Sequence, residues 1–465
     1  MNKRDIYWGY AAQILNIGFG LIMLPVIVHY MSSVEVGLWF VFMTLISLAQ
    51  LLEFGFLPTL SRNFAYVYAG AQKLSAFGLE ENGDGKLNTQ LLADLIASAR
   101  FIYRWIALLA CLVLIAGGSF YISTVLPKEQ NILVVYGGWF FFVIGNVINF
   151  YYGYLNSLLQ GRGDVTEANK VIIASKCIQV LIGLVLVLAG YGLLGLGIAS
   201  LVSTVVSRVI AKHFVYSGCR PEMDNLVVSD HGVKDITKIV WHNASRFGVV
   251  LLGVFLIWRA NILIASSFLG LADAASYGLA IQLFSLINTI ATVPFNLALP
   301  KLNTMRAQGK KGKLYQSFSV LLFLALIVYL VSALSVIFFG NYFLSAIGSS
   351  IKLPNDFILS IMAIVFLLEI NHGTCANFIT TGNQIPFVKA AIFTGIGIVV
   401  ASIFLTPTFG IVGLVISQGL VQVAYNNWKW PMEVGKIFNV NYSQIIWGGF
   451  LLFKKNLITK ILKNQ

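Results

Sequence analysis

Arg259 occupies a position in this sequence that requires a chemical explanation. It lies near the centre of an apolar run of 23 residues, 247–269, and is the only charged residue in that run. An arginine in the middle of a membrane helix is costly, so it normally faces the interior of a helix bundle or a water-filled cavity. A guanidinium keeps its charge and binds two oxygens at once, which suits phosphates and carboxylates. Together with Lys176, which lies inside another apolar run, Arg259 predicts a cationic site for an anionic substrate.

Acidic and histidine residues inside the apolar runs suggest a second kind of chemistry. Glu369 and His372 are spaced i, i+3, so they share one helix face and could relay protons. The alternative is a polar pair that only holds neighbouring helices together. Glu53 lies one turn from the end of its apolar run. The alternative interpretation of Arg259 is an ion pair with Glu53 or Glu369. Such a pair would pin helices together instead of binding a substrate.

The composition shows that membrane helices must position these residues. Hydrophobic residues make up 58% of the 465 positions, charged residues 11%, and the mean hydropathy is +0.83. A soluble domain usually carries about a quarter charged residues. Spans of about 20 apolar residues are long enough to cross a bilayer, and the backbone must then be helical. Twelve such spans are predicted, near 8–28, 36–57, 102–124, 132–153, 170–188, 192–212, 247–268, 275–297, 316–339, 357–376, 389–405 and 410–428.

The distribution of basic residues predicts that both chain ends are cytoplasmic. With the N-terminus inside, the cytoplasmic ends and loops hold 27 of the 31 lysines and arginines. The outer loops hold Lys128 and Lys352, and the spans hold Lys176 and Arg259. The net charge of +13 therefore reflects topology and attraction to anionic lipid heads, and we expect no nucleic-acid partner.

The sequence lacks the motifs of several chemistries. The GKKGK run at 309–313 does not match GxxxxGK[ST], so it is interpreted as a basic loop and not as a nucleotide site. HExxH, Ser–His–Asp and paired-aspartate patterns do not occur. The cysteines form no CxxC pair, which argues against disulfides and zinc. We therefore expect a protein that is not an enzyme and has no cofactor and no metal. The cysteines are Cys111, Cys177, Cys219 and Cys375.

The two halves of the chain resemble each other. YGLLGLGIAS at 191–200 matches FGIVGLVISQ at 409–418, and weaker matches occur in the same order in the two halves. Spans 1–6 are thus repeated as spans 7–12, which predicts an all-α polytopic membrane protein with two parallel six-helix bundles around a central cleft. Rocking of two such bundles is typical of a transporter. The predicted parts are an N-terminal lobe 1–214, a cytoplasmic linker 215–245, a C-terminal lobe 246–430 and a basic, amphipathic cytoplasmic tail 431–465.

Three stretches carry a resemblance to a known family. In LLEFGFLPTLSRNFAYVYAGAQKL (51–74), an acidic residue precedes a glycine and a Thr–Leu–x–Arg turn. LLADLIASARFIYRW (91–105) enters the third span, and GYLNSLLQGRGDVTEANKV (153–171) joins the fourth and fifth. With the twelve-span plan, these make the whole chain similar to O-antigen flippases, in the polysaccharide transporter family of the multidrug/oligosaccharidyl-lipid/polysaccharide (MOP) exporter superfamily. The matching residues of the first stretch are Glu53, Gly55, Thr59, Leu60 and Arg62.

The resemblance implies a function and a location. Such proteins move an undecaprenyl-pyrophosphate-linked oligosaccharide from the cytoplasmic to the periplasmic leaflet of the bacterial inner membrane, coupled to an ion gradient. The substrate-binding residues would be Arg259 and Lys176, with Glu53 and Arg62 as secondary candidates. By the same implication, Glu369 and His372 are candidates for proton or ion coupling. Expected partners are the lipid-linked oligosaccharide, membrane lipids, and the O-antigen polymerase and chain-length regulator.

Three other functions remain alternatives. A drug/cation antiporter on the same fold needs a membrane carboxylate, but spans 1 and 7 contain no Asp or Glu. A membrane glycosyltransferase or polymerase would be expected to carry a large polar catalytic loop. A lipid II flippase would share the fold and the charge pattern, and would differ only in the head group that it carries.

Overall fold

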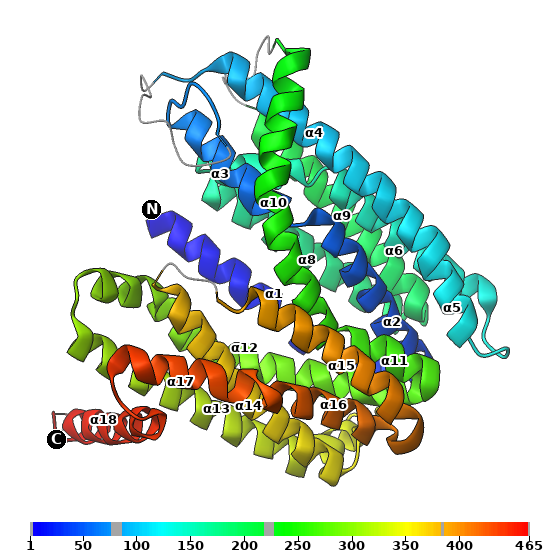
Figure 1. Cartoon of the computed structure of the whole chain (residues 1–465). Helices are drawn as coiled ribbons and strands as arrows, with labels where there is room; N and C mark the ends of the chain where they lie inside the picture. Colours follow the sequence, from blue (N-terminus) through cyan, green and yellow to red (C-terminus); the bar gives the residue numbers. More distant parts are fainter. Residues whose placement is uncertain (1–2, 76–85, 218–226, 383–385, 464–465) are drawn as a thin grey trace. The chain divides into compact units, whose positions relative to one another are not determined.

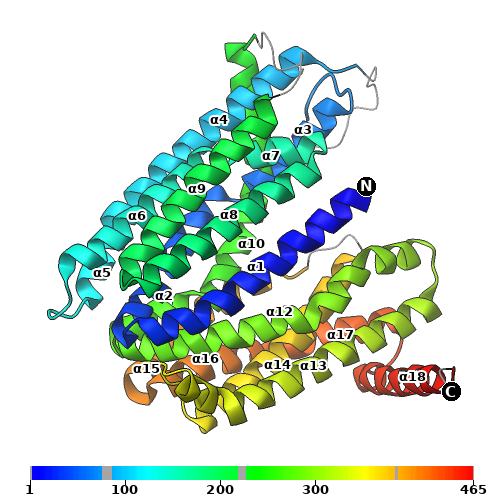
Figure 2. The same cartoon turned by 180° about the vertical axis from the view of Figure 1, so that it is seen from behind.

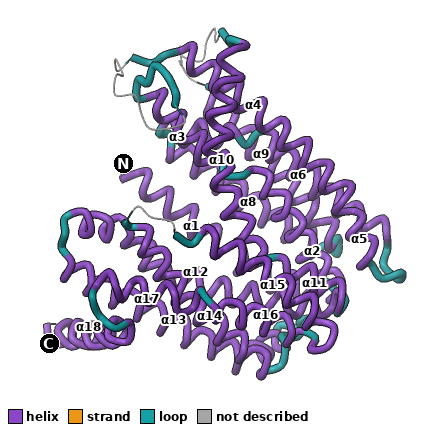
Figure 3. Tube along the Cα trace, viewed as in Figure 1, coloured by secondary structure: helices purple, strands orange, loops and turns teal. Residues whose placement is uncertain are grey.

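The computed structural model describes residues 3–75, 86–217, 227–382 and 386–463, and these residues form helices joined by short loops (Figure 1, Figure 3). The expected all-helical membrane fold is therefore confirmed. Within the described residues, ten helices are long and apolar enough to cross a membrane. They cover ten of the twelve predicted spans, and the first and twelfth spans correspond to α1 (Lys3–Tyr30) and the 14-residue α16 (Ile411–Ala424).

The chain divides into two compact units, Met1–Phe255 and Leu256–Gln465. The first unit contains α1, the other helices of the N-terminal half and most of α10. Their bounds are α2 (Ser33–Gln50), η1 (Leu51–Glu53), α3 (Phe56–Tyr68), α4 (Thr89–Leu112), the π-helical η2 (Val113–Gly118), α5 (Ser119–Val125), α6 (Ile132–Tyr151), α7 (Tyr154–Arg162), α8 (Val165–Leu188), α9 (Gly192–Tyr216) and α10 (Asp230–Trp258).

Polar residues just before the helices fix where several of them begin. Ser32 and Glu35 form a reciprocal capping box at the start of α2. Asn88, Asn131 and Asn355 each accept a hydrogen bond from a backbone N–H in the first turn of the following helix. These side chains satisfy donors that the first turn of a helix leaves without a backbone partner.

Helices α6 and α9 pack closely in the first unit, and Figure 2 shows them side by side. A Cβ placed on Gly197 would lie 2.5 Å from the backbone oxygen of Gly138. Only hydrogen at these positions allows the two backbones to approach so closely. Small residues therefore set the distance between α6 and α9, the helices that also supply one wall of the site described below.

The start of α10 is fastened to α4 within the first unit. The backbone N–H of Ser229 donates to Asp94 Oδ1 at 2.7 Å, and Ser98 Oγ donates to the carbonyl oxygen of Val233 at 3.0 Å. The cytoplasmic linker predicted at 215–245 and the lobe boundary predicted after it stay predictions. Helix α10 starts at Asp230, and its residues up to Phe255 belong to the first unit.

The second unit is built from α11 to α18, with a core rich in phenylalanine. Phe318 and Phe378 are fully buried, with ring centroids 4.3 Å apart, and Trp430 and Val434 belong to the same cluster. Besides α16, the helices are α11 (Ala260–Phe268), α12 (Leu271–Ala307), α13 (Lys311–Ala346), α14 (Asp356–Thr380), α15 (Val388–Phe409), α17 (Asn426–Phe438) and α18 (Tyr442–Lys463).

The C-terminal segment packs against α13 over part of its length. Tyr315 on α13 donates a hydrogen bond to the carbonyl oxygen of Gln444 at 2.9 Å, and the Phe323 ring lies 5.9 Å from that of Phe453. The contacts advance along both helices in the same direction, so α13 and α18 run parallel here. The exposed lysines Lys454 and Lys455 follow, and an amphipathic character of the tail stays a prediction.

Candidate functional site: a cationic pocket in the first unit

A stripe of polar side chains follows one face of α9. The stripe consists of Ser200, Ser203, Thr204, Ser207 and Arg208. Their spacing of i, i+3, i+4, i+7 and i+8 places all five on one side of the helix. The hydroxyls are largely satisfied by the helix itself: Ser203 Oγ donates to the carbonyl oxygen of Ser200 at 2.9 Å, and Ser207 Oγ to that of Thr204 at 2.8 Å. The stripe ends at Arg208, so α9 presents hydroxyls and one guanidinium to its neighbours.

This face of α9 forms one wall of a pocket of about 290 Å³. Side chains from α2, α6, α7 and α8 complete it, and all of them belong to the first unit. Most of the lining is polar, and none of the described lining residues is Asp or Glu. The lining consists of Met43, Ile46, Gln50, Phe142, Asn146, Asn149, Asn156, Val171, Ile172, Ser175, Lys176, Gln179, Ser200, Ser203, Thr204, Ser207 and Arg208.

Arg208 is the most deeply buried cation of this pocket. Its side chain is 9% exposed, and Nη2 donates a hydrogen bond to Asn149 Oδ1. Two further buried donors, Nε and Nη1, have no hydrogen-bond partner among the described residues. A buried donor without an acceptor is unfavourable by about 1–3 kcal/mol, and more when the group is charged. Nε and Nη1 of Arg208 can therefore donate hydrogen bonds to an acceptor that enters the pocket.

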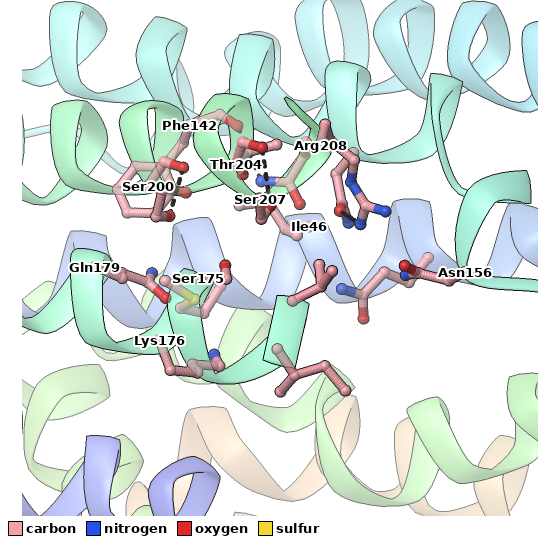
Figure 4. A pocket seen from close by; sticks show the side chains of 17 residues that line it. Ile46, Phe142, Asn156, Ser175, Lys176, Gln179, Ser200, Thr204, Ser207 and Arg208 are labelled. Carbon is pink, nitrogen blue, oxygen red and sulfur yellow. Dashed lines mark hydrogen bonds between the residues drawn. The ribbon is translucent and has the colours of Figure 1, made fainter. Parts of the chain in front are cut away.

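Lys176 supplies a second positive charge to the same pocket. It lies on α8 beside Ser175, one turn before Gln179, and Figure 4 shows these side chains across the pocket from Ser207 and Arg208. Lys176 thus lines a pocket within the first unit, and its substrate-binding role stays a prediction. Its cationic neighbour in that cavity is Arg208, a residue that the sequence count had assigned to the cytoplasmic ends. Two cations and many amide and hydroxyl groups can bind an anionic, hydroxyl-rich molecule.

Glu53 lies close to this pocket without lining it. The hydroxyl of Tyr103, on α4, donates to Glu53 Oε1 at 2.6 Å, and Arg208 interacts electrostatically with both Glu53 and Tyr103. The hydrogen bond from Tyr103 fixes the carboxylate at the end of η1, where it partly balances the charge of Arg208. Glu53 therefore acts on the pocket through Arg208.

Arg62, the other secondary candidate, lies on α3 and is exposed to the surroundings. It is not among the residues that line the pocket of Lys176 and Arg208. The structure therefore does not bring Arg62 together with Lys176.

Arg259 lies at an interruption of the helix. It separates α10 from α11 and occupies the N-cap position of α11, with φ −120° and ψ −35°. Its side chain is half-buried, and within the described residues of the second unit it forms no ion pair with Glu369. Arg259 belongs to the second unit and Lys176 to the first.

Glu369 and His372 lie in a buried polar network of the second unit. His372 Nε2 is 3.8 Å from Glu369 Oε1, while Gln422 Nε2 donates to Glu369 Oε2 at 2.9 Å. The network continues through Asn426, whose Nδ2 donates to Gln422 Oε1 at 2.8 Å and to Thr394 Oγ1 at 3.0 Å. The predicted proximity of Glu369 and His372 is confirmed, and the carboxylate is bound by a glutamine of α16.

Arg208 and the amides beside it were not predicted as site residues, because Arg208 lies near the predicted end of its span. Helix α9 continues to Tyr216, two turns beyond Arg208. The periodic polar stripe that leads to Arg208 is visible in the sequence, and so is the spacing of Asn146 and Asn149 on α6. A search for polar residues on one face of an apolar span would have found both.

No arrangement suited to a metal is present in the residues described. His, Cys, Asp and Glu side chains do not gather there in groups of three or more, and Cys111, Cys177 and Cys375 are free thiols. Cys219 lies outside the described residues.

Comparison with known proteins relates the chain to transporters by structure. No protein-family model matches the sequence, and no curated protein is significantly similar to it. An inward-facing multidrug resistance MATE family transporter of the MOP superfamily superposes with a TM-score of 0.68 at 13% identity, covering 91% of this chain and 95% of that one. The lipid II flippase MurJ, in an inward closed conformation, gives a TM-score of 0.63 at 12% identity, covering 98% and 92%.

A third similar structure is a MOP superfamily transporter from Pyrococcus furiosus, for which the reverse polarity of the binding pocket suggests a different function. It superposes with a TM-score of 0.52 at 14% identity, covering 95% of this chain and 94% of that one. These similarities extend over nearly the whole chain. The chain therefore has the fold of MOP superfamily transporters.

Proposed function

We propose that this protein is a flippase for a lipid-linked oligosaccharide with an anionic head group. The substrate would be an undecaprenyl-pyrophosphate-linked O-antigen repeat unit, moved from the cytoplasmic to the periplasmic leaflet of a bacterial inner membrane. The observation that carries this proposal is the pocket of Arg208 and Lys176, in which two donors of a buried guanidinium have no acceptor among the described residues. The whole-chain similarity to transporters of the MOP superfamily supports transport as the activity.

The charge of the pocket favours an anionic substrate over a cationic drug. Arg208 can offer Nε and Nη1 to a pyrophosphate or an acidic sugar, while Lys176 adds a second positive charge. The amides of Asn146, Asn149 and Gln179 can bind sugar hydroxyls. A cationic drug would meet two positive charges here, and no lining carboxylate among the described residues would compensate them.

We expect transport by alternating access, in which the substrate site opens first to one side of the membrane and then to the other. Arg208 and Lys176 would hold the head group in the first unit while the polyprenyl chain stays in the lipid. Arg259 stays a candidate head-group ligand of the second unit. Glu369 and His372 would take up and release the coupling ion.

The test is complementation of bacteria that each lack one exporter. Strains without an O-antigen flippase, a lipid II flippase or a drug exporter receive this chain, and surface polysaccharide, growth and drug resistance are measured. We expect surface polysaccharide to return. Arg208→Ala and Lys176→Ala should each reduce it about tenfold or more, because each removes a charged hydrogen-bond donor. Lys212→Ala is the matched control, since Lys212 is exposed one turn further along α9.

Three outcomes would contradict this proposal. Full export by the Arg208→Ala, Lys176→Ala double variant would remove the pocket as the substrate site. Restored growth of the strain without a lipid II flippase, in place of surface polysaccharide, would reassign the substrate to lipid II. Restored drug resistance alone would assign the chain to the antiporters. Membrane levels of each variant, measured by immunoblot, separate lost transport from lost folding.

A further inference from the structure

A second cavity lies on the outer side of the first unit, between α4 and α6. It has a volume of about 530 Å³, and its walls are apolar along most of their length. It shares no residue with the pocket of Arg208 and Lys176. The α4 and η2 side is formed by Arg104, Ala107, Leu108, Cys111, Leu112, Ile115 and Ala116, and the α6 side by Val147 and Tyr151.

The shape of this groove follows from the spacing and size of its residues. On α4, Arg104, Leu108, Cys111 and Leu112 recur on one helix face, and the small side chain of Ala107 leaves the floor of the groove open. At the far end, the π-helical segment η2 contributes Ile115 and Ala116 to the lining. A π-helical turn inside an α-helix is rare and is frequently found at functional sites.

Arg104 lies at one end of the groove and lines it with the aliphatic part of its side chain, since almost all of the lining is apolar. Arg104 is exposed, and in the described ranges no acidic side chain forms an ion pair with it. Tyr151, at the C-terminal end of α6, lines the same end of the groove. By the charge distribution of the sequence, this is the cytoplasmic interface of the membrane. From Arg104 to Ile115 the helix rises ~16 Å, which matches one leaflet of a hydrocarbon core of about 30 Å.

We propose that this groove binds an anionic phospholipid of the cytoplasmic leaflet. One acyl chain lies along Leu108, Leu112 and Ile115 down to the bilayer midplane, and the phosphate accepts hydrogen bonds from the guanidinium of Arg104. The hydroxyl of Tyr151 contributes a further donor to the head group. A positive charge at the interface and an apolar channel one leaflet deep fit this lipid class, whereas a zwitterionic head group would gain less from Arg104.

The experiment measures lipids retained by the full chain after mild detergent extraction. Native mass spectrometry compares phosphatidylglycerol with phosphatidylcholine, each added at equal concentration. We expect the wild type to retain phosphatidylglycerol preferentially. Arg104→Ala should lower that retention about tenfold, because it removes charged hydrogen bonds to the phosphate. Cys111→Phe, which fills the groove and keeps Arg104, should lower the retention of both lipids.

Lys212→Ala, which removes an exposed cation on α9 away from the groove, is the control and should retain phosphatidylglycerol as the wild type does. Unchanged retention in Arg104→Ala, or equal retention of the two lipids by the wild type, would overturn the proposal. Displacement of phosphatidylglycerol by undecaprenyl phosphate would also overturn it, because the groove would then hold the transported lipid. These outcomes do not depend on whether the complementation experiment succeeds.

Discussion

At the scale of single residues, the cations of this protein differ in what surrounds them. Arg208 is buried beside Asn149 and near Glu53, whereas Arg259 caps a short helix at an interruption of the chain's seventh span. The interruption explains how a guanidinium is accommodated within an apolar run. A helix break exposes backbone groups as well as the side chain, and such breaks occur in membranes where they line a cavity or are buried in protein. A functional role for Arg259 thus rests on its charge and on its place at the break.

Replacing Arg259 tests that role. Arg259→Ala should abolish surface polysaccharide in the complementation assay while the protein stays in the membrane at its normal level, because the change removes a charge and no described ion pair. Arg259→Lys, which keeps the charge and loses the planar fork, should retain part of the export. Full export by Arg259→Ala would show that transport does not require this residue.

At the scale of helices, the pocket depends on how closely α6 and α9 approach. The contact between Gly138 and Gly197 brings these backbones together, and a few turns further along, Asn146, Asn149 and Arg208 meet in the pocket. Packing between membrane helices relies on close van der Waals contact, since the lipid removes the usual hydrophobic driving force. A side chain inserted into the glycine contact would therefore change the geometry of the pocket as well as the stability.

Gly197→Ala should destabilise the first unit by about 1–3 kcal/mol, since its Cβ would lie 2.5 Å from a backbone oxygen that cannot rotate away. The measurement is the thermal unfolding of the purified protein in detergent, followed by tryptophan fluorescence. The matched control is Gly312→Ala on α13, where a Cβ meets nothing within 4 Å. Alanine favours a helix over glycine, so the control should be neutral or slightly stabilising. Equal effects of the two substitutions would show that the α6–α9 contact adapts.

At the scale of the whole molecule, each of the two units carries its own polar site. The first contains the cationic pocket, and the second contains the network of Glu369, His372 and Gln422. Helix α10 contributes to both units and is followed directly by the break at Arg259. Coupled transport requires that binding in one unit and ion uptake in the other bias the same conformational change. Glu369 is the acidic residue of the second unit best placed for this task.

Glu369→Gln tests the coupling. The glutamine can still accept a hydrogen bond from Gln422, so the network keeps its shape while the carboxylate is lost. We expect transport by this variant to lose its response to an imposed pH gradient, measured as flipping of a lipid-linked oligosaccharide in proteoliposomes with and without the gradient. Glu433→Gln on α17 is the control for loss of an acidic group from the same unit. An unchanged response in Glu369→Gln would assign proton coupling to another group.

The sequence by itself determined the class of this protein and the placement of most spans. Hydropathy along the chain is a local property, and the bilayer turns every long apolar run into a helix. The spacing of Glu369 and His372 was sufficient to place them in contact, because both lie on one helix face. The sequence also singled out Lys176, which lines the pocket of the first unit, while its role in substrate binding stays a prediction.

Only the tertiary structure decided which residues share a site. It brought Arg208, Asn149 and Lys176 together from three helices, placed Arg259 at a helix break in the other unit, and left Arg62 exposed. The rotation and depth of each helix depend on contacts such as those of Gly138 and Gly197, which are made between segments far apart in the chain. A pattern within one span cannot specify such contacts, because they depend on the partner helix as much as on the span itself.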